Sequence, residues 1–116
     1  MLKRVAIAAL LLAAWPALLL AHHGWGSYDS KNPVTVTGKI LTSVYENPHA
    51  TITVQGSDKV WTVTLAPTSR MRNRGALPEL IKVGAEVTVF GYPSTADPSE
   101  MRAERITSGG KTIEMR

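Results

Sequence analysis

Hydrophobic and polar residues alternate along most of the chain, with the period of two that is typical of a β-strand with one buried face. The segment 33–46 (PVTVTGKILTSVYE) keeps this pattern over a long stretch. Gly38 interrupts its apolar set, and a missing side chain at such a position favours a bulge or a bend. We therefore expect one long, half-buried strand, bent near Gly38, with these residues facing the core: Val34, Val36, Ile40 and Val44.

The next two alternating segments predict a β-hairpin. Segments 49–55 (HATITVQ) and 59–65 (KVWTVTL) flank the turn sequence Gly56-Ser57-Asp58, and Asn47-Pro48 before them marks a turn. Their alternation predicts the following inward-facing residues: Ala50, Ile52, Val54, Trp61, Val63 and Leu65.

Two further strands are expected in the second half of the chain. Segment 85–93 (AEVTVFGYP) predicts a fourth strand with Val87 and Val89 inward, and segment 101–108 (MRAERITS) predicts a fifth. Because Ala103 and Ile106 have opposite parity, the fifth strand is expected to be bulged or shifted in register. Gly109-Gly110 then turns the chain into a short tail at 111–115.

The pattern changes to a short helix between the third and fourth segments. Thr68 or Ser69 can cap a helix over 70–74, and Gly75 suits a left-handed helix exit. Segment 77–84 is expected to form a loop. Three strands, a short helix and two strands are the order of the five-stranded OB-fold barrel, so we predict this all-β fold, with another small antiparallel barrel or a sandwich as the alternative.

The first 21 residues (MLKRVAIAALLLAAWPALLLA) differ from the rest of the chain. Lys3 and Arg4 precede an apolar run that ends at the small residue Ala21, which is the order of a secretory signal peptide. A retained membrane anchor is the alternative, but the run is slightly short and contains Pro16. We predict a signal peptide at 1–21, an N-terminal arm at 22–32 and a barrel at 33–116, in a periplasmic protein without a membrane anchor after cleavage.

Composition narrows the function classes. Without Lys3 and Arg4, 11 basic residues face 9 acidic ones, so the net charge falls from +4 to +2. An exported chain so weakly basic gives no support for nucleic acid as a partner. The absence of cysteine excludes thiol chemistry and disulfides. No nucleophile elbow or phosphate-binding glycine loop is present, so we expect binding rather than catalysis.

Several short segments form a distinctive combination: His22-His23-Gly24, 32–38 (NPVTVTG), 47–50 (NPHA), Asn73-Arg74-Gly75 and 83–91 (VGAEVTVFG). Together they resemble a group of small exported bacterial proteins classified as a domain of unknown function. The resemblance covers nearly the whole chain after residue 21 and implies no activity, because none is established for the group. Thr51 stands where an aromatic residue is usual and Ala76 where Trp is frequent, which argues against an aromatic ligand platform at either position.

The three histidines, His22, His23 and His49, are the candidate metal ligands. Neutral imidazole is the commonest protein ligand for copper and zinc, and cleavage after Ala21 would give His22 both a free amine and an imidazole. His23 or His49 could supply another nitrogen, which predicts a copper site of the histidine-brace type. The alternative is that His22 and His23 merely follow the cleavage site and that His49 bonds to local backbone. The thioethers of the methionines offer a cuprous variant: Met71, Met101 and Met115.

Arginines and aromatic residues are the second candidate site. On a helix Arg70 and Arg74 share a face at i, i+4 while Arg72 points away, and guanidinium forks bind carboxylates and phosphates. Tyr45 has the outward parity of its strand and could stack against a ligand. We therefore predict, as the competing function, a module that binds a peptide, sugar or anionic ligand through these residues. The alternative is a solvated face in which the arginines pair with neighbouring carboxylates.

Two further aromatic residues, Trp25 and Tyr28, are expected to dock the N-terminal arm onto the barrel. Arg102 and Arg105, from the predicted fifth strand, are further candidates for holding an anionic ligand. The alternative is that they pair with the neighbouring Glu100 and Glu104. A docked arm would hold His22 and His23 near the barrel.

Overall fold

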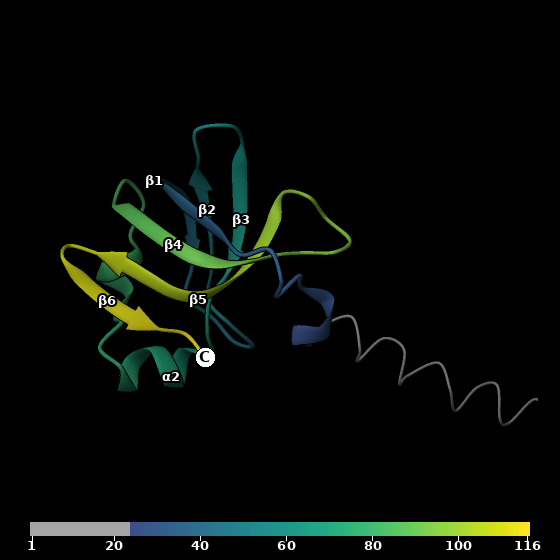
Figure 1. The fold of residues 1–116 in the computed structure, drawn as a ribbon. Helices are drawn as coiled ribbons and strands as arrows, with labels where there is room; N and C mark the ends of the chain where they lie inside the picture. The colour runs from purple at the N-terminus through teal and green to yellow at the C-terminus, as the bar shows by residue number, and fades with distance from the viewer. Residues whose placement is uncertain (1–23) are drawn as a thin grey trace, which may run out of the picture.

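The computed structural model describes residues 24–116, so the predicted signal peptide at 1–21, together with His22 and His23, lies outside the described residues. Figure 1 shows a curled sheet with helix α2 beneath it and the N-terminal arm to one side. The elements, in chain order, are η1 (Trp25–Ser27), β1 (Val34–Val44), β2 (Thr51–Gln55), β3 (Val60–Thr64), α2 (Thr68–Asn73), η2 (Pro78–Ile81), β4 (Glu86–Pro93), β5 (Glu100–Ser108) and β6 (Lys111–Glu114).

Five of the strands close into a barrel. The hydrogen-bonded order is β3-β2-β1-β4-β5-β6, and a parallel pairing of β3 with β5 closes the ring. All other strand pairs are antiparallel. Helix α2 lies between β3 and β4 in the chain, so the predicted five-stranded OB-type barrel is confirmed.

Strand β1 pairs with two different strands along its length, in agreement with the predicted bend. Residues 34–39 pair with β4, and residues 40–44 pair with β2. At Gly38 the chain lies so close to the main chain of Gln55 that an added Cβ would collide with its carbonyl oxygen. The glycine therefore allows the tight approach at the point where β1 changes partner.

One predicted inward position of β1 is wrong. The pairing of β1 with β2 shifts register between Ile40 and Thr42, which leaves Leu41 as a bulge. A bulge of one residue exchanges the faces of every residue after it. Val44, predicted to face the core, is therefore 48% exposed, and Tyr45, predicted to face outward, packs against the core.

The second half of the barrel contains a confirmed bulge and an unpredicted strand. Phe90 pairs with Arg105 and Gly91 with Ala103, so Glu104 is the extra residue of β5. This bulge allows Ala103 and Ile106 both to be buried despite their opposite parity. The predicted tail is wrong in its conformation, because residues 111–114 form strand β6 antiparallel to β5.

Helix α2 begins differently from the prediction and ends as expected. Its N-cap residue is Pro67, without a side-chain capping bond, so neither Thr68 nor Ser69 is the cap. The side chain of Asn47, from the β1–β2 loop, instead accepts hydrogen bonds from the Thr68 amide and hydroxyl. Gly75 has a φ of 85°, the left-handed exit that the sequence predicted. The predicted loop at 77–84 contains η2, which buries Ile81.

The core lies inside the barrel and beneath α2. It includes all six predicted inward residues of the hairpin, and also Val87 and Val89 of β4. Met71 from α2 and Ile81 from η2 cover the end of the barrel. Within residues 24–116 no helix is long and apolar enough to cross a membrane.

Candidate functional site

The N-terminal arm is attached to the barrel by main-chain hydrogen bonds. Tyr28 forms an isolated antiparallel bridge with Ser94, in the connection that follows β4. The amide of Asp29 donates to the carbonyl of Pro93, and the amide of Thr95 donates to that of Ser27. The arm from Gly24 onward therefore has a defined place against β4 and β5, as the sequence predicted from its aromatic residues.

Trp25 anchors the beginning of the arm. The guanidinium carbon Cζ of Arg102 lies 4.1 Å from the centroid of the Trp25 ring, and that of Arg116 lies 4.7 Å from it. Tyr28 and Tyr92 make edge contacts with the same ring, at centroid distances of 6.3 and 6.1 Å. Cation–π contacts of this kind stabilise by about 0.5–2 kcal/mol each, depending on desolvation.

Tyr28 provides a second attachment. Its hydroxyl donates a 2.8 Å hydrogen bond to the carboxylate of Glu100 on β5. Burial, and then the hydrogen bond and charge of Glu100, raise the pKa of Tyr28, while Thr64 and Arg102 act in the opposite direction. Tyr28 therefore lies over the outer face of the barrel where β3 and β5 pair.

His49 lies at the start of the neighbouring strand. Ala50 is fully buried. Its amide donates to the carbonyl of Ala66 and its carbonyl accepts from the amide of Leu65, so the hydrogen-bond ladder between β2 and β3 extends back to Ala50. Successive side chains of a strand point to opposite faces, so His49 shares the outer face with Thr51. Thr51 pairs with Thr64, which contacts Tyr28. The half-buried His49 is thus on the face of the barrel that also carries the arm.

Residues 24–116 do not supply a metal site by themselves. No group of three or more His, Cys, Asp or Glu side chains in this range is placed to hold a metal ion. His49 is the one predicted ligand inside the range, and His22 and His23 lie outside it. The three methionines considered for a cuprous site are all buried in the core: Met71, Met101 and Met115.

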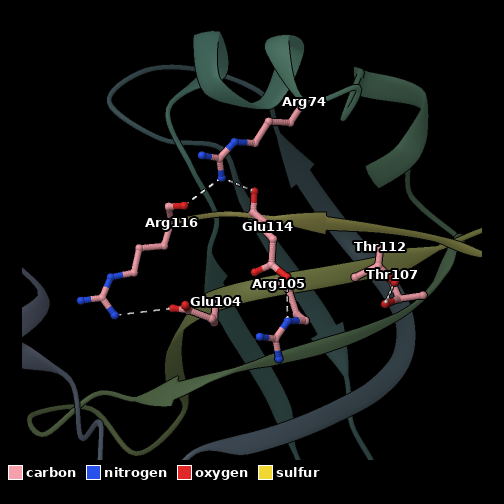
Figure 2. Close-up of polar contacts among 7 residues, drawn as sticks. All are labelled: Arg74, Glu104, Arg105, Thr107, Thr112, Glu114 and Arg116. Carbon is pink, nitrogen blue, oxygen red and sulfur yellow. Dashed lines mark hydrogen bonds and ion pairs between the residues drawn. The ribbon is translucent and has the colours of Figure 1, made fainter.

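The arginines of α2 lie as the helical spacing predicted, but they face the end of the chain. Arg70 donates to the carbonyl oxygen of Met115 at 3.0 Å. Arg74 donates to the main-chain oxygens of Glu114 and Arg116, at 2.9 and 2.8 Å (Figure 2). These contacts connect α2 to the segment around β6.

Arg72 points away from that pair. Its Cζ lies 5.1 Å from the ring centroid of Tyr45, and the Tyr45 hydroxyl donates a 2.6 Å hydrogen bond to the carbonyl of Ala76. Of the predicted ligand-binding set, Arg72 and Tyr45 are therefore together, while Arg70 and Arg74 are on the other side of the helix.

The carboxylates near the fifth strand form the two ion pairs of the described residues. Arg105 contacts Glu114 at 3.0 Å and Arg116 contacts Glu104 at 3.7 Å, as Figure 2 shows. The predicted pairing of Arg105 within its own strand is replaced by this cross-strand pair with β6.

Sequence reasoning missed the contact of Arg102 and Arg116 with Trp25. A signal was present, because alternation from buried Met101 and Ala103 places Arg102 on the outer face beside the predicted arm. No local pattern pointed to Arg116. It lies near Trp25 only because strand β6, which precedes it, pairs with β5.

The comparisons with known proteins give a family and a fold. A family model described as a family of unknown function, DUF6152, matches residues 9–101. The chain belongs to DUF6152. The predicted resemblance to a group of unknown function is thereby confirmed, and membership brings no activity with it. No curated protein is significantly similar in sequence to this DUF6152 chain.

The barrel is similar to part of a larger solved structure. That structure is the ZRD-deleted mutant of TiaS in complex with agmatine, with a TM-score of 0.52 and 17% sequence identity. The similarity covers 75% of this DUF6152 chain and 27% of the TiaS chain. At this identity the likeness shows a shared fold alone.

Proposed function

We propose that the protein is a non-catalytic, exported copper-binding protein, whose ligands are the amine and imidazole of His22 with His23 or His49. The processed chain would start at His22, after removal of residues 1–21 in the course of export to the periplasm. One residue then offers two nitrogen donors, and a third from another imidazole suits the tetragonal nitrogen coordination that Cu(II) prefers.

The observation that carries this function is the place of the arm. The ring of Trp25 is in contact with Arg102 and Arg116, and Tyr28 is bonded to Glu100, so Gly24 is next to a fixed anchor. An extended chain spans at most about 3.6 Å per residue. In the processed chain, the two residues before Gly24 could span at most about 7 Å, which sets the reach of the free amine.

The position of His49 supports the three-nitrogen form. Thr51 and Arg102 pair with opposite sides of Thr64. Neighbouring strands are about 4.8 Å apart. The start of β2, where His49 lies, is two strands away from β5, whose Arg102 contacts Trp25, so the two are on the order of 10 Å apart. An imidazole on that face and an amine within reach of Gly24 can approach a common ion.

The helix arginines support the competing ligand-binding function less well. Arg70 and Arg74 already donate to main-chain oxygens near β6, and Arg72 lies over Tyr45. The three guanidinium groups therefore do not converge on a single ligand, because Arg72 lies on the other side of the helix from Arg70 and Arg74.

The test is a Cu(II) titration of protein whose first residue is shown by mass analysis to be His22. We expect saturable one-to-one binding, with nitrogen splitting in the electron paramagnetic resonance spectrum. A variant with one alanine added before His22 keeps every imidazole but moves the free amine, so its affinity should fall by about a hundredfold. Unchanged binding in this variant would refute the histidine brace.

A second variant separates the two forms of the site. His49→Ala should weaken Cu(II) binding by about tenfold if His49 is the third ligand, and His23→Ala should do so if His23 is. If both variants bind like the wild type while the extended chain does not, the site consists of His22 alone.

A further inference from the structure

We propose that Arg70, Arg102 and Arg116 form a binding site for an oxyanion, a carboxylate or a phosphate group, on the outside of the barrel beside Trp25. The three guanidinium groups come from α2, from β5 and from the segment after β6. This site does not depend on the proposed copper function and uses none of its ligands.

The three cations are brought together by separate contacts. Arg102 and Arg116 share the ring of Trp25, with Cζ atoms 4.1 and 4.7 Å from its centroid. Arg70 donates to the carbonyl of Met115, the residue next to Arg116 in the chain. Burial lowers the pKa of Arg102; Tyr28 acts in the opposite direction, and the positive charges of Arg70 and Arg116 lower the pKa further.

The cluster lacks a matching number of carboxylates. Among residues 24–116, the ion pairs are those of Arg105 with Glu114 and of Arg116 with Glu104, the latter at a long 3.7 Å. Glu100, the other acidic residue on this strand, accepts from the Tyr28 hydroxyl. Among the described residues, Arg102 therefore has no carboxylate partner.

One buried donor of the cluster is also unpaired. In the described residues, the Nε atom of Arg102 is a buried side-chain atom without a hydrogen-bond partner. The buried Oε2 atom of Glu104 also lacks one, but it is an acceptor and faces Arg116 at 3.7 Å. Partly desolvated cations without counter-charge are unfavourable, and an anion that enters the cluster removes that cost. Guanidinium forks match the planar geometry of carboxylate and phosphate oxygens, which fixes the chemical class of the ligand.

Arg116 is the residue that can move to receive the ligand. Its side chain is 57% exposed, and its contact with Glu104 is too long for a hydrogen bond (Figure 2). Arg102, in contrast, is held over Trp25 and would form the fixed part of the site. Binding should therefore perturb the fluorescence of Trp25.

The test uses the processed protein and two simple probes, inorganic phosphate and acetate, at constant ionic strength maintained with chloride. We expect a saturable change in tryptophan fluorescence and a rise in the melting temperature with at least one probe. A response to phosphate alone assigns a phosphate ligand, and a response to acetate assigns a carboxylate. No response to either probe overturns the oxyanion site.

Variants distinguish the site from general stabilisation by phosphate. Arg102→Gln and Arg116→Gln should each weaken binding of the probe by about tenfold or more. Arg72→Gln, on the other side of α2, is the matched control and should bind like the wild type. If Arg102→Gln fails to fold, Arg116→Gln decides, because the side chain of Arg116 is 57% exposed and lies outside the core. Unchanged binding in Arg116→Gln, or an equal loss in Arg72→Gln, would overturn the site.

Discussion

The guanidinium of Arg102 lies over the ring of Trp25, with 4.1 Å between Cζ and the ring centroid. This contact joins a residue of β5 to a residue 77 positions earlier in the chain, which is part of a three-residue 3₁₀ turn. A turn of this length has no stability of its own, so its position depends on the barrel surface. Arg102 is therefore one of the contacts that order the N-terminal arm.

The first prediction concerns release of the arm. Arg102→Gln should lower the free energy of unfolding by about 1–2 kcal/mol, because it removes a partly desolvated cation–π contact. Hydrogen exchange should become faster at the amides of Asp29 and Thr95, which bond across the arm. Arg105→Gln is the control, because Arg105 lies over Phe90 and not over the arm. Equal exchange rates in Arg102→Gln and the wild type would mean that Trp25 is held by other contacts.

The second prediction is a loss of stability at high pH through Tyr28. Burial and Glu100 raise the pKa of Tyr28 above its ordinary value of 10.0. The folded state thus favours the neutral hydroxyl, and this contribution is fully present below pH 10 and lost as the pH rises through the higher folded-state pKa. Urea unfolding between pH 8 and 11 should show that the stability difference between the wild type and Tyr28→Phe shrinks above pH 10.

Glu100→Gln is the matched control for that titration. It keeps an acceptor for the Tyr28 hydroxyl but removes the negative charge that helps to raise the pKa. In the Glu100→Gln background the pKa of Tyr28 should be raised less. The stability difference between the protein with Tyr28 and its Tyr28→Phe variant should therefore shrink by a smaller amount above pH 10 than in the wild-type background. A difference between wild type and Tyr28→Phe that is constant from pH 8 to 11 would contradict the coupling.

The third prediction concerns the bend of β1. Gly38→Ala should lower the free energy of unfolding by about 3 kcal/mol, because the new Cβ would overlap the carbonyl group of Gln55 and force the two strands apart. Gly26→Ala is the control, because nothing lies within 4 Å of its added Cβ. Thermal unfolding of both variants measures the difference, and equal melting temperatures would exclude the close approach at Gly38.

The strands could be predicted because the core of this barrel is formed by alternating residues that need no long-range information. The prediction failed at Leu41, where one bulged residue exchanged the faces of Val44 and Tyr45. Val and Tyr can both be buried, so the sequence gives no sign of which of these two neighbours faces the core. β6 was missed for a similar reason, since a four-residue edge strand contains too few residues to show a period.

The candidate site was only partly readable from the sequence. The docking of Trp25 and Tyr28 followed from their aromatic character, and helical spacing placed Arg70 and Arg74 on one face. The partners of these residues could not be predicted, because they depend on β6, which brings Arg116 and the main chain of Met115 to the arm and the helix.

The fourth prediction tests the exchanged faces of β1. Tyr45→Phe should lower the free energy of unfolding by about 1 kcal/mol, because it removes the hydrogen bond to the Ala76 carbonyl and leaves that acceptor partly buried. Val44→Thr, next to it, should change stability by less than about 0.5 kcal/mol, because Val44 is exposed. Urea unfolding measures both, and the reverse order of the two effects would restore the original alternation.

The fifth prediction connects the anchor to the proposed copper site. With Trp25 in place, Cu(II) binding orders few further residues, because the chain is already fixed at Gly24. In Trp25→Ala the arm must be ordered when the metal binds, and fixing one residue costs about 1–2 kcal/mol. Since 1.4 kcal/mol corresponds to a tenfold change, Cu(II) affinity should fall by about tenfold or more while the stoichiometry stays one to one.

Arg105→Gln again serves as the control for that measurement, since it removes a cation–π contact of the same strand without touching the arm. Its Cu(II) affinity should equal that of the wild type. A competition titration with a chelator of known affinity measures all three proteins. If Trp25→Ala releases the arm, as hydrogen exchange at Asp29 and Thr95 would report, and yet binds Cu(II) with unchanged affinity, then the anchored arm does not preorganise the site, and the metal is held by His22 and His23 without help from the barrel.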